Sequence, residues 1–105
     1  MSTQSMLLII SEYFKTQPVE KAWLFGSYSR GEETPTSDVD ILVQYDRSHR
    51  IGLLKIAGLI VDLEKLLNLP IDLVEEKGLL PYARESVNRD KKLFYERSLG
   101  WMGGS

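Results

Sequence analysis

The sequence predicts a single α+β domain in which a small β-sheet is flanked by helices. Three observations support this fold class. The length of 105 residues suits one domain, and a content of 43% hydrophobic and 27% charged residues is typical of a globular protein. Helix-type periodicity also alternates along the chain with short strand-type runs. We expect the domain to span residues 1–99 and residues 100–105 to form a flexible tail.

The first half of the chain predicts a helix followed by two strands. Apolar residues recur at helical spacing over Met6–Phe14, and Pro18 closes this segment. The continuous apolar run Ala22–Phe25 predicts a strand buried on both faces. Gly31–Ser37 predicts a loop by its glycine, proline and hydroxyl residues. Asp38–Tyr45 then alternates between its two faces and predicts a second strand that begins with carboxylates.

The second half predicts two helices and two strands. Apolar residues of Ile51–Leu69 surround most of a helical wheel, whereas a surface helix shows one stripe, so this helix is either deeply buried or contacts a partner. Pro70–Val74 predicts a third strand, Pro81–Asn88 a helix with proline in its first turn, and Leu93–Tyr95 a closing strand. His49 is expected to be a solvated loop residue, since no ligand set accompanies it.

The composition excludes several classes of function. The chain has no cysteine, which excludes disulfides, thiolate metal sites and cysteine nucleophiles. No stretch approaches the ~20 apolar residues of a membrane helix, and the N-terminus lacks the features of a signal peptide, so we expect a cytoplasmic protein. A net charge of −2 with scattered lysine and arginine argues against general nucleic-acid binding.

The residues after the first predicted strand suit a triphosphate. Gly26 permits close approach of the backbone to a ligand, and the helix start that follows presents free N–H groups to an anion. Ser27 adds a hydroxyl donor, and Arg30 lies three residues further on. Two alternatives remain open: Gly-Ser after a strand is also a common turn, and Arg30 can instead pair with a local carboxylate such as Glu32 or Glu33.

Three carboxylates suit a divalent cation. Asp38 and Asp40 share one face of the second strand with Cα atoms about 6.5–7 Å apart, where Mg²⁺ would relieve their repulsion. Asp72 interrupts an apolar strand, where a charge is costly unless it is paired or metal-bound. If the third strand lies beside the second, the three carboxylates meet, as two-metal phosphoryl transfer requires. The alternatives are a helix cap or solvated strand end for the first two and a turn residue for Asp72.

The order and spacing of these residues resemble a family signature. Gly26-Ser27, then ten residues, then Asp38-Val39-Asp40 is similar to the Gly-Ser-x10-Asp-x-Asp pattern of the DNA polymerase β-like nucleotidyltransferase superfamily, above all of its minimal members, the MNT domains. Ile71–Val74 is similar to the strand that carries the third carboxylate of the family. The resemblance covers residues 5–96 and implies a polymerase β-like core with a mixed sheet.

The resemblance also implies a role for each residue of the motif. Gly26 and Ser27 would hold the triphosphate of ATP, with Arg30 as a further phosphate contact. Asp38 and Asp40 would ligate two Mg²⁺ ions. Asp72 would complete the metal-binding carboxylates and take the general-base position near the acceptor hydroxyl.

The resemblance extends to a biological role. MNT domains are similar to the antitoxin half of a two-gene module whose other half is an all-helical HEPN ribonuclease, and this implies transfer of AMP to a tyrosine of that toxin, within a possible homo- or hetero-oligomer. One alternative is a non-catalytic antitoxin that neutralises its partner stoichiometrically, although the complete set of Asp38, Asp40 and Asp72 favours catalysis. Another is transfer to a small molecule such as an aminoglycoside, for which we would expect an additional helical domain.

Overall fold

The computed structural model describes residues 1–48, 50–97 and 100–101, so His49 and residues 102–105 of the expected tail lie outside the described residues. The strands are β1 (Val19–Phe25), β2 (Val39–Tyr45), β3 (Ile71–Glu75), β4 (Lys92–Glu96) and β5 (Gly100–Trp101). The helices are α1 (Thr3–Phe14), α2 (Ser27–Arg30), α3 (Leu53–Leu67) and α4 (Pro81–Asp90), with a 3₁₀ turn, η1 (Glu76–Gly78), after β3. The predicted α+β class and the predicted order of helices and strands are confirmed.

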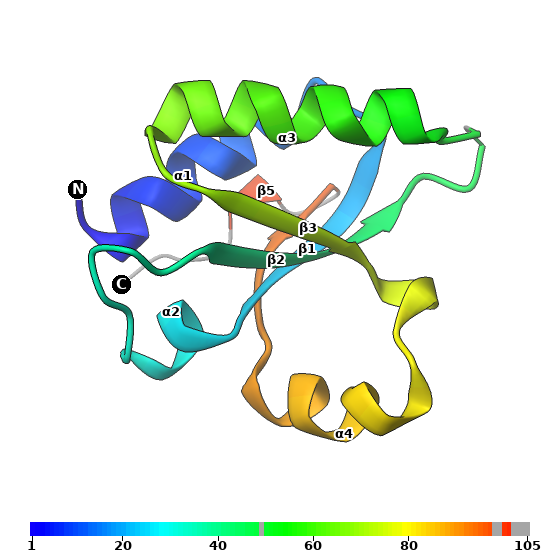
Figure 1. Cartoon of the computed structure of the whole chain (residues 1–105). Coiled ribbons are helices and arrows are strands. Elements are labelled where there is room, and N and C mark those ends of the chain that lie inside the picture. The colour runs from blue at the N-terminus through cyan, green and yellow to red at the C-terminus, as the bar shows by residue number, and fades with distance from the viewer. Residues whose placement is uncertain (49, 98–99, 102–105) are drawn as a thin grey trace.

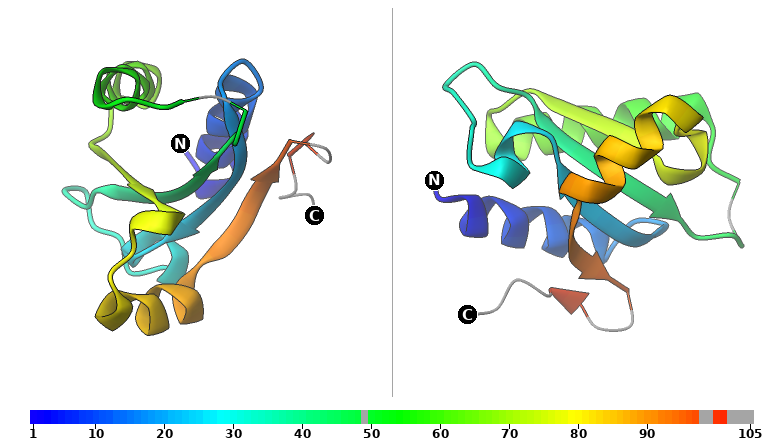
Figure 2. Two further views of the ribbon diagram at one scale, coloured as in Figure 1. Left: turned by 90° about the vertical axis from the view of Figure 1, so that its right-hand side faces the viewer. Right: turned by 90° about the horizontal axis from the view of Figure 1, so that it is seen from below.

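The strands form a mixed sheet with helices on both sides (Figure 1). In the part of the chain that the structure describes, the sheet has five strands in the order β3-β2-β1-β4-β5. Helices α1 and α3 lie on one face of the sheet and α4 lies on the other, as the two turned views in Figure 2 also show. Gly100 and Trp101, which the sequence placed in the tail, form β5 and pair antiparallel with β4.

The sheet is mixed because its connections differ in length. β1 pairs antiparallel with both β2 and β4, whereas β2 and β3 are parallel. Parallel neighbours need a crossover, and α3 supplies it while covering one face of the sheet. The register of the parallel pair places Asp40 directly beside Asp72.

The helix ends follow from the sequence. Ser2 caps α1, since its Oγ accepts the backbone N–H of Ser5 at 3.1 Å. Asn68 ends α3 in the left-handed conformation, with φ of 55°. Pro81 occupies the first turn of α4, as predicted, where its missing N–H costs no hydrogen bond.

The hydrophobic core lies between the sheet and the helices α1 and α3. Its fully buried side chains include Ile10 and Phe14 of α1, Ile41 and Val43 of β2, and Leu63 of α3. The predicted apolar face of β2 is therefore the core face. Burial of this kind is the main favourable contribution to the stability of a small domain.

Helix α3 buries only one of its apolar faces. Leu59, Leu63 and Leu67 face the core, but Leu53 and Leu54 are 85% and 91% exposed. Of the two alternatives for this over-apolar helix, deep burial is wrong. The helix instead presents leucines to its surroundings, as a partner-binding helix would.

The second face of the sheet is only partly covered. Ala22 and Leu24 of β1 are buried in the core, whereas Trp23 and Phe25 on the other side are half-buried. The prediction that this run is buried on both faces is therefore correct for the core face alone. Lys91, which follows α4, places its Nζ 4.9 Å from the centre of the Trp23 ring.

No helix among the described ranges is both long enough and apolar enough to cross a membrane.

Two substitutions in α3 should separate core burial from helix propensity. Leu63→Ala should lower the free energy of unfolding by about 2–5 kcal/mol, because it removes a fully buried side chain. Leu54→Ala makes the same chemical change at a position that is 91% exposed and should cost less than about 0.5 kcal/mol. Urea unfolding of both variants provides the test, and equal midpoints would contradict the placement of the core.

Candidate active site

The turn after β1 has a backbone that favours glycine. Gly26 has φ of 73° and ψ of −154°, a region in which side chains other than hydrogen are strained. Ser29 is 4% exposed, and its Oγ donates to the carbonyl oxygen of Gly26 at 2.9 Å. The Ser27 carbonyl accepts the Glu32 N–H at 2.9 Å, which closes the loop that follows α2. The Gly-Ser turn is thus fixed by hydrogen bonds to its own neighbours.

Gly26 also makes room for Asp40. A Cβ at position 26 would lie 3.0 Å from Cγ of Asp40 and would overlap its Oδ2. This approach arises because Phe25, the last residue of β1, pairs with Asp40 across the antiparallel strands. The two halves of the sequence motif, separated by ten residues, therefore meet at one point in the structure.

The three predicted carboxylates lie where the neighbouring strands β2 and β3 begin, a region called the carboxylate edge below. Asp40 and Asp72 are register partners on parallel strands, so their Cα atoms are about 4.8 Å apart. Their neighbours Ile41 and Ile71 are buried in the core, and side chains alternate along a strand, so both carboxylates lie on the face opposite α1 and α3. Asp38 directly precedes β2, two residues from Asp40. The third strand does lie beside the second, as the carboxylate hypothesis required.

Asp40 is the carboxylate most affected by this setting. Burial raises its pKa above the ordinary value, and the charges of Asp72 and Asp38 raise it further. The charge of Arg30 acts in the opposite direction and lowers it. Burial, together with the negative charge of its neighbours, thus disfavours ionised Asp40 in the protein alone, and a cation at this edge would relieve that penalty.

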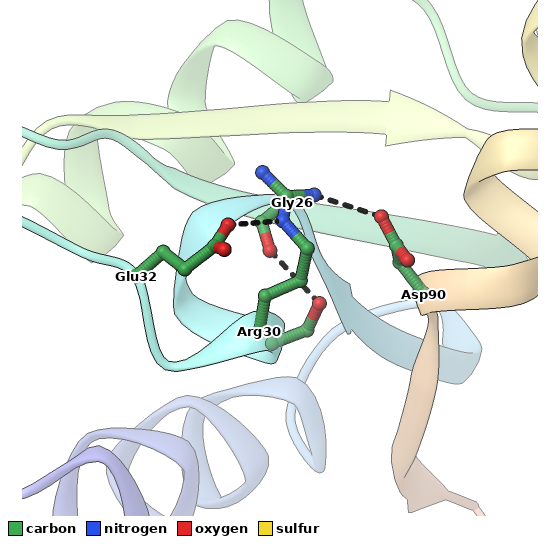
Figure 3. A network of polar contacts seen from close by, with 5 residues as sticks. Gly26, Arg30, Glu32 and Asp90 are labelled. Atoms are coloured by element: carbon green, nitrogen blue, oxygen red, sulfur yellow. Dashed lines mark hydrogen bonds and ion pairs between the residues drawn. The ribbon is translucent and has the colours of Figure 1, made fainter.

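Arg30 pairs with two carboxylates. Its Nε donates to Glu32 at 2.7 Å and its Nη1 donates to Asp90 at 2.7 Å (Figure 3). The pairing with a local carboxylate, left open by the sequence, is therefore present. Asp90 was missed by the sequence analysis because it lies 60 residues away on another element. The signal that would have marked it is an acidic residue at the C-terminal end of a helix, where a cation is favoured.

The donor chemistry of this edge fits Mg²⁺. Within the described residues, no three histidine, cysteine, aspartate or glutamate side chains are arranged as a ready-made metal site. Mg²⁺ does not need such a cage, because it usually takes one or two protein carboxylates and completes its shell with water and substrate phosphates. Asp38, Asp40 and Asp72 supply hard oxygen donors whose mutual repulsion a cation would reduce.

The sequence matches a described family and several curated relatives. The family model for the nucleotidyltransferase domain matches residues 6–94. A provisionally assigned protein adenylyltransferase of Methanocaldococcus jannaschii is 37% identical over 83 residues, which make up 78% of this chain and 80% of the relative. The protein adenylyltransferase MntA of Thermococcus cleftensis is 42% identical over 72 residues, or 69% of this chain and 71% of the relative.

Solved structures share the fold. A provisionally assigned minimal nucleotidyltransferase has a TM-score of 0.71 at 33% identity, over 84% of this chain and 88% of its own. A toxin–antitoxin structure with AMP-PNP has a TM-score of 0.71 at 21% identity, over 90% and 74% of the two chains. A structure of a tri-AMPylated HEPN toxin of Shewanella oneidensis in complex with an MNT antitoxin has a TM-score of 0.63 at 20% identity, over 92% of this chain and 76% of its own.

Two glycine substitutions should separate backbone strain from steric conflict. Gly26 and Gly31 both have positive φ, 73° and 71°, but a Cβ at Gly31 meets nothing within 4 Å. Gly31→Ala should therefore cost about 1–2 kcal/mol of stability. Gly26→Ala should cost about 3 kcal/mol or more, because the Asp40 carboxylate must also move. Chemical denaturation measures both, and equal losses would contradict the close approach of Gly26 and Asp40.

In metal-free protein, the ionised carboxylate of Asp40 should lower the free energy of unfolding. The pKa of Asp40 is raised in the folded state, so its ionisation lowers the free energy of unfolding. This loss of stability develops as pH rises from the unfolded pKa, about 3.9, through the folded pKa. Asp40→Asn in EDTA should thus be more stable than the parent at pH 7, by less than about 1 kcal/mol since the group is partly exposed and screened. The gain should vanish near pH 4.

Asp46→Asn provides a control of opposite sign for this pH series. Hydrogen bonds from Ser48 and Arg97 hold the pKa of Asp46 below its usual range, so its ionised form stabilises the fold. Asp46→Asn should be less stable than the parent at pH 7, and this loss should shrink as pH falls through the lowered pKa. Melting curves from pH 2 to pH 7 in which both variants shift in the same direction, or in which the loss in Asp46→Asn does not shrink below pH 4, would contradict the electrostatic account.

Proposed function

The chain belongs to the nucleotidyltransferase domain family, and we propose that it transfers AMP from ATP to a tyrosine hydroxyl of a helical HEPN partner, for which it acts as the antitoxin. The observation that carries the proposal is the junction at which the Gly26 backbone meets Asp40, with Asp72 beside it. The names of the relatives support adenylyl transfer to protein, and the toxin–antitoxin complexes support the partner.

Different residues of the junction would bind the triphosphate and the metal ions. Gly26 and Ser27 would hold the triphosphate, because the turn leaves no side chain between its backbone and a ligand. Asp38, Asp40 and Asp72 would hold two Mg²⁺ ions. When bound, these ions would offset the charge of the triphosphate and stabilise the attacking and leaving oxygens.

The proposed reaction is a single in-line displacement. The acceptor oxygen forms a bond to the α-phosphorus of ATP, the bond from that phosphorus to the bridging oxygen breaks, and pyrophosphate leaves. Asp72 accepts the proton of the acceptor hydroxyl. This role suits Asp72 because its side chain is exposed at the strand edge, whereas Asp40 is half-buried against Gly26. The chain itself mainly positions the reactants.

The acceptor would come from a partner that contacts α3. Val61 and Leu66 of α3 are 47% and 51% exposed, in addition to the exposed Leu53 and Leu54. An open apolar groove of about 510 Å³ lies between α1 and α3, with Leu8, Ile9, Tyr13 and Leu66 among its lining residues. Exposed apolar side chains beside an apolar groove are features of protein interaction sites. We place the helical partner on this surface and the reaction in the cytoplasm.

One alternative has an observation in its favour. The same apolar surface can bind a partner without any nucleotide transfer, which would make the chain a stoichiometric antitoxin. Transfer to a small molecule has no comparable observation, because the described apolar surface suits a macromolecule. The two partner-based functions differ in whether the carboxylates are needed.

Asp40→Asn should abolish transfer. The protein is incubated with its partner, ATP and Mg²⁺, and intact mass spectrometry follows the addition of AMP to the partner. Asp40→Asn keeps the size of the side chain but removes a charge from the metal-binding set, so transfer should fall by about three orders of magnitude or more. Asp46→Asn is the matched control, because Asp46 follows the opposite end of β2 and lies outside the proposed site. This variant should retain transfer.

Pull-down and growth assays separate catalysis from binding. Asp40→Asn should still bind the partner, because the apolar surface of α3 is unchanged, whereas Leu54→Asp should weaken binding while leaving the fold intact. Full rescue of growth by Asp40→Asn protein that adds no AMP would replace the enzymatic proposal by the stoichiometric one. Transfer by Asp40→Asn at the parent rate would contradict the assignment of Asp40 to the active site.

A further inference from the structure

We propose that Asp90 is a positioning residue, which holds the guanidinium of Arg30 beside the carboxylate edge so that its free N–H groups can donate to the triphosphate. The inference rests on the proposed function, because it names how one contact of the same nucleotide site is set. It adds a residue of α4 to a site whose motif residues all lie between the end of β1 and the end of β3.

Two of the three guanidinium nitrogens of Arg30 donate hydrogen bonds to carboxylates, and the third has no such partner among the described residues. Glu32 accepts from Nε and Asp90 accepts from Nη1, each at 2.7 Å. Nη2 donates to none of the residues that the structure describes. In Figure 3 the remaining terminal nitrogen lies away from both carboxylates. A planar guanidinium that is held by two acceptors presents its other donors in a set direction.

Arg30 itself belongs to the proposed nucleotide site. Arg30 is a cation whose charge reaches Asp40, where it opposes the effects of Asp72 and Asp38. It is also the last residue of α2, the turn of helix that directly follows Gly26. An arginine on the helical turn that directly follows Gly26 can contact a triphosphate held by the backbone of that turn.

Asp90 is better suited than Glu32 to set this position. The Asp90 side chain is 22% exposed, whereas that of Glu32 is 65% exposed and belongs to the loop that follows α2. Asp90 ends α4, where a carboxylate is disfavoured by the helix dipole unless a cation compensates it. The next residue, Lys91, packs over the Trp23 ring of β1, so this end of α4 is anchored to the sheet.

A purely structural role makes a different prediction. If the Arg30–Asp90 pair only tied α4 to α2, its loss would change stability and leave nucleotide affinity unchanged. Exposed ion pairs of this type contribute little to stability. A positioning role therefore predicts a loss of affinity that is large relative to the loss of stability.

The test compares two isosteric substitutions around one guanidinium. Calorimetry measures the affinity of the full chain for AMP-PNP and for inorganic tripolyphosphate, each with Mg²⁺. Asp90→Asn should weaken both by about five- to tenfold, the effect of weakening one charge-assisted hydrogen bond. Glu32→Gln should weaken them by less than about twofold, because its carboxylate is exposed and screened. Both melting temperatures should stay within about 5 °C of the parent.

Two further variants show whether Asp90 acts through Arg30. Asp90→Glu keeps the charge and should recover most of the affinity. In an Arg30→Ala background, Asp90→Asn should cause no further loss, because the group that it positions is gone.

The outcomes separate this inference from the function on which it rests. Additive losses for the Asp90 and Arg30 substitutions, or unchanged affinity in Asp90→Asn, would overturn the positioning role and leave the nucleotide site standing. A parent protein that binds neither AMP-PNP nor tripolyphosphate with Mg²⁺ would overturn the proposed function and this inference together.

Discussion

The candidate site depends on the contact between the Gly26 backbone and the Asp40 carboxylate. Antiparallel pairing of β1 with β2 brings the end of one strand to the start of the other, and the absence of a side chain at Gly26 lets the carboxylate lie against the turn. A ligand that reaches the backbone of this turn is therefore also within reach of the carboxylate edge. The strained backbone of Gly26 is maintained by Ser29, whose hydroxyl is committed to the Gly26 carbonyl.

Negative charge accumulates at the same edge, and the rest of the second face is arranged around it. Parallel pairing of β2 with β3 adds Asp72 to Asp38 and Asp40, and the pKa of Asp40 is raised by its burial and by these neighbouring charges. The helices α1 and α3 cover the opposite face, which leaves the carboxylate face partly open. The end of α4 comes close enough for Asp90 to reach Arg30. A half-covered sheet face thus combines a fixed scaffold with access for a charged ligand.

The domain separates its chemistry from its apolar surface. The carboxylates lie on one face of the sheet, and the exposed leucines of α3 belong to the helical layer on the other. In the proposed function, a partner would be held by the helical layer while a segment of it reaches the junction. The proposed arrangement would give a use to the leucines of α3 that the core leaves exposed.

The sequence by itself determined the elements and the motif. Periodicity is a local property, so the helices, the strands and the buried face of β2 could be predicted within a few residues of their positions. The Gly-Ser and Asp-x-Asp residues were identified by their order and spacing, which resemble a family signature. Tertiary structure decided what depends on distant pairs. It set the parallel register that joins Asp40 to Asp72, the pairing of Gly100–Trp101 with β4, and the exposure of one face of α3. It also brought Asp90 to Arg30 across 60 residues, because a contact between two elements follows from how they pack and leaves no period in the chain.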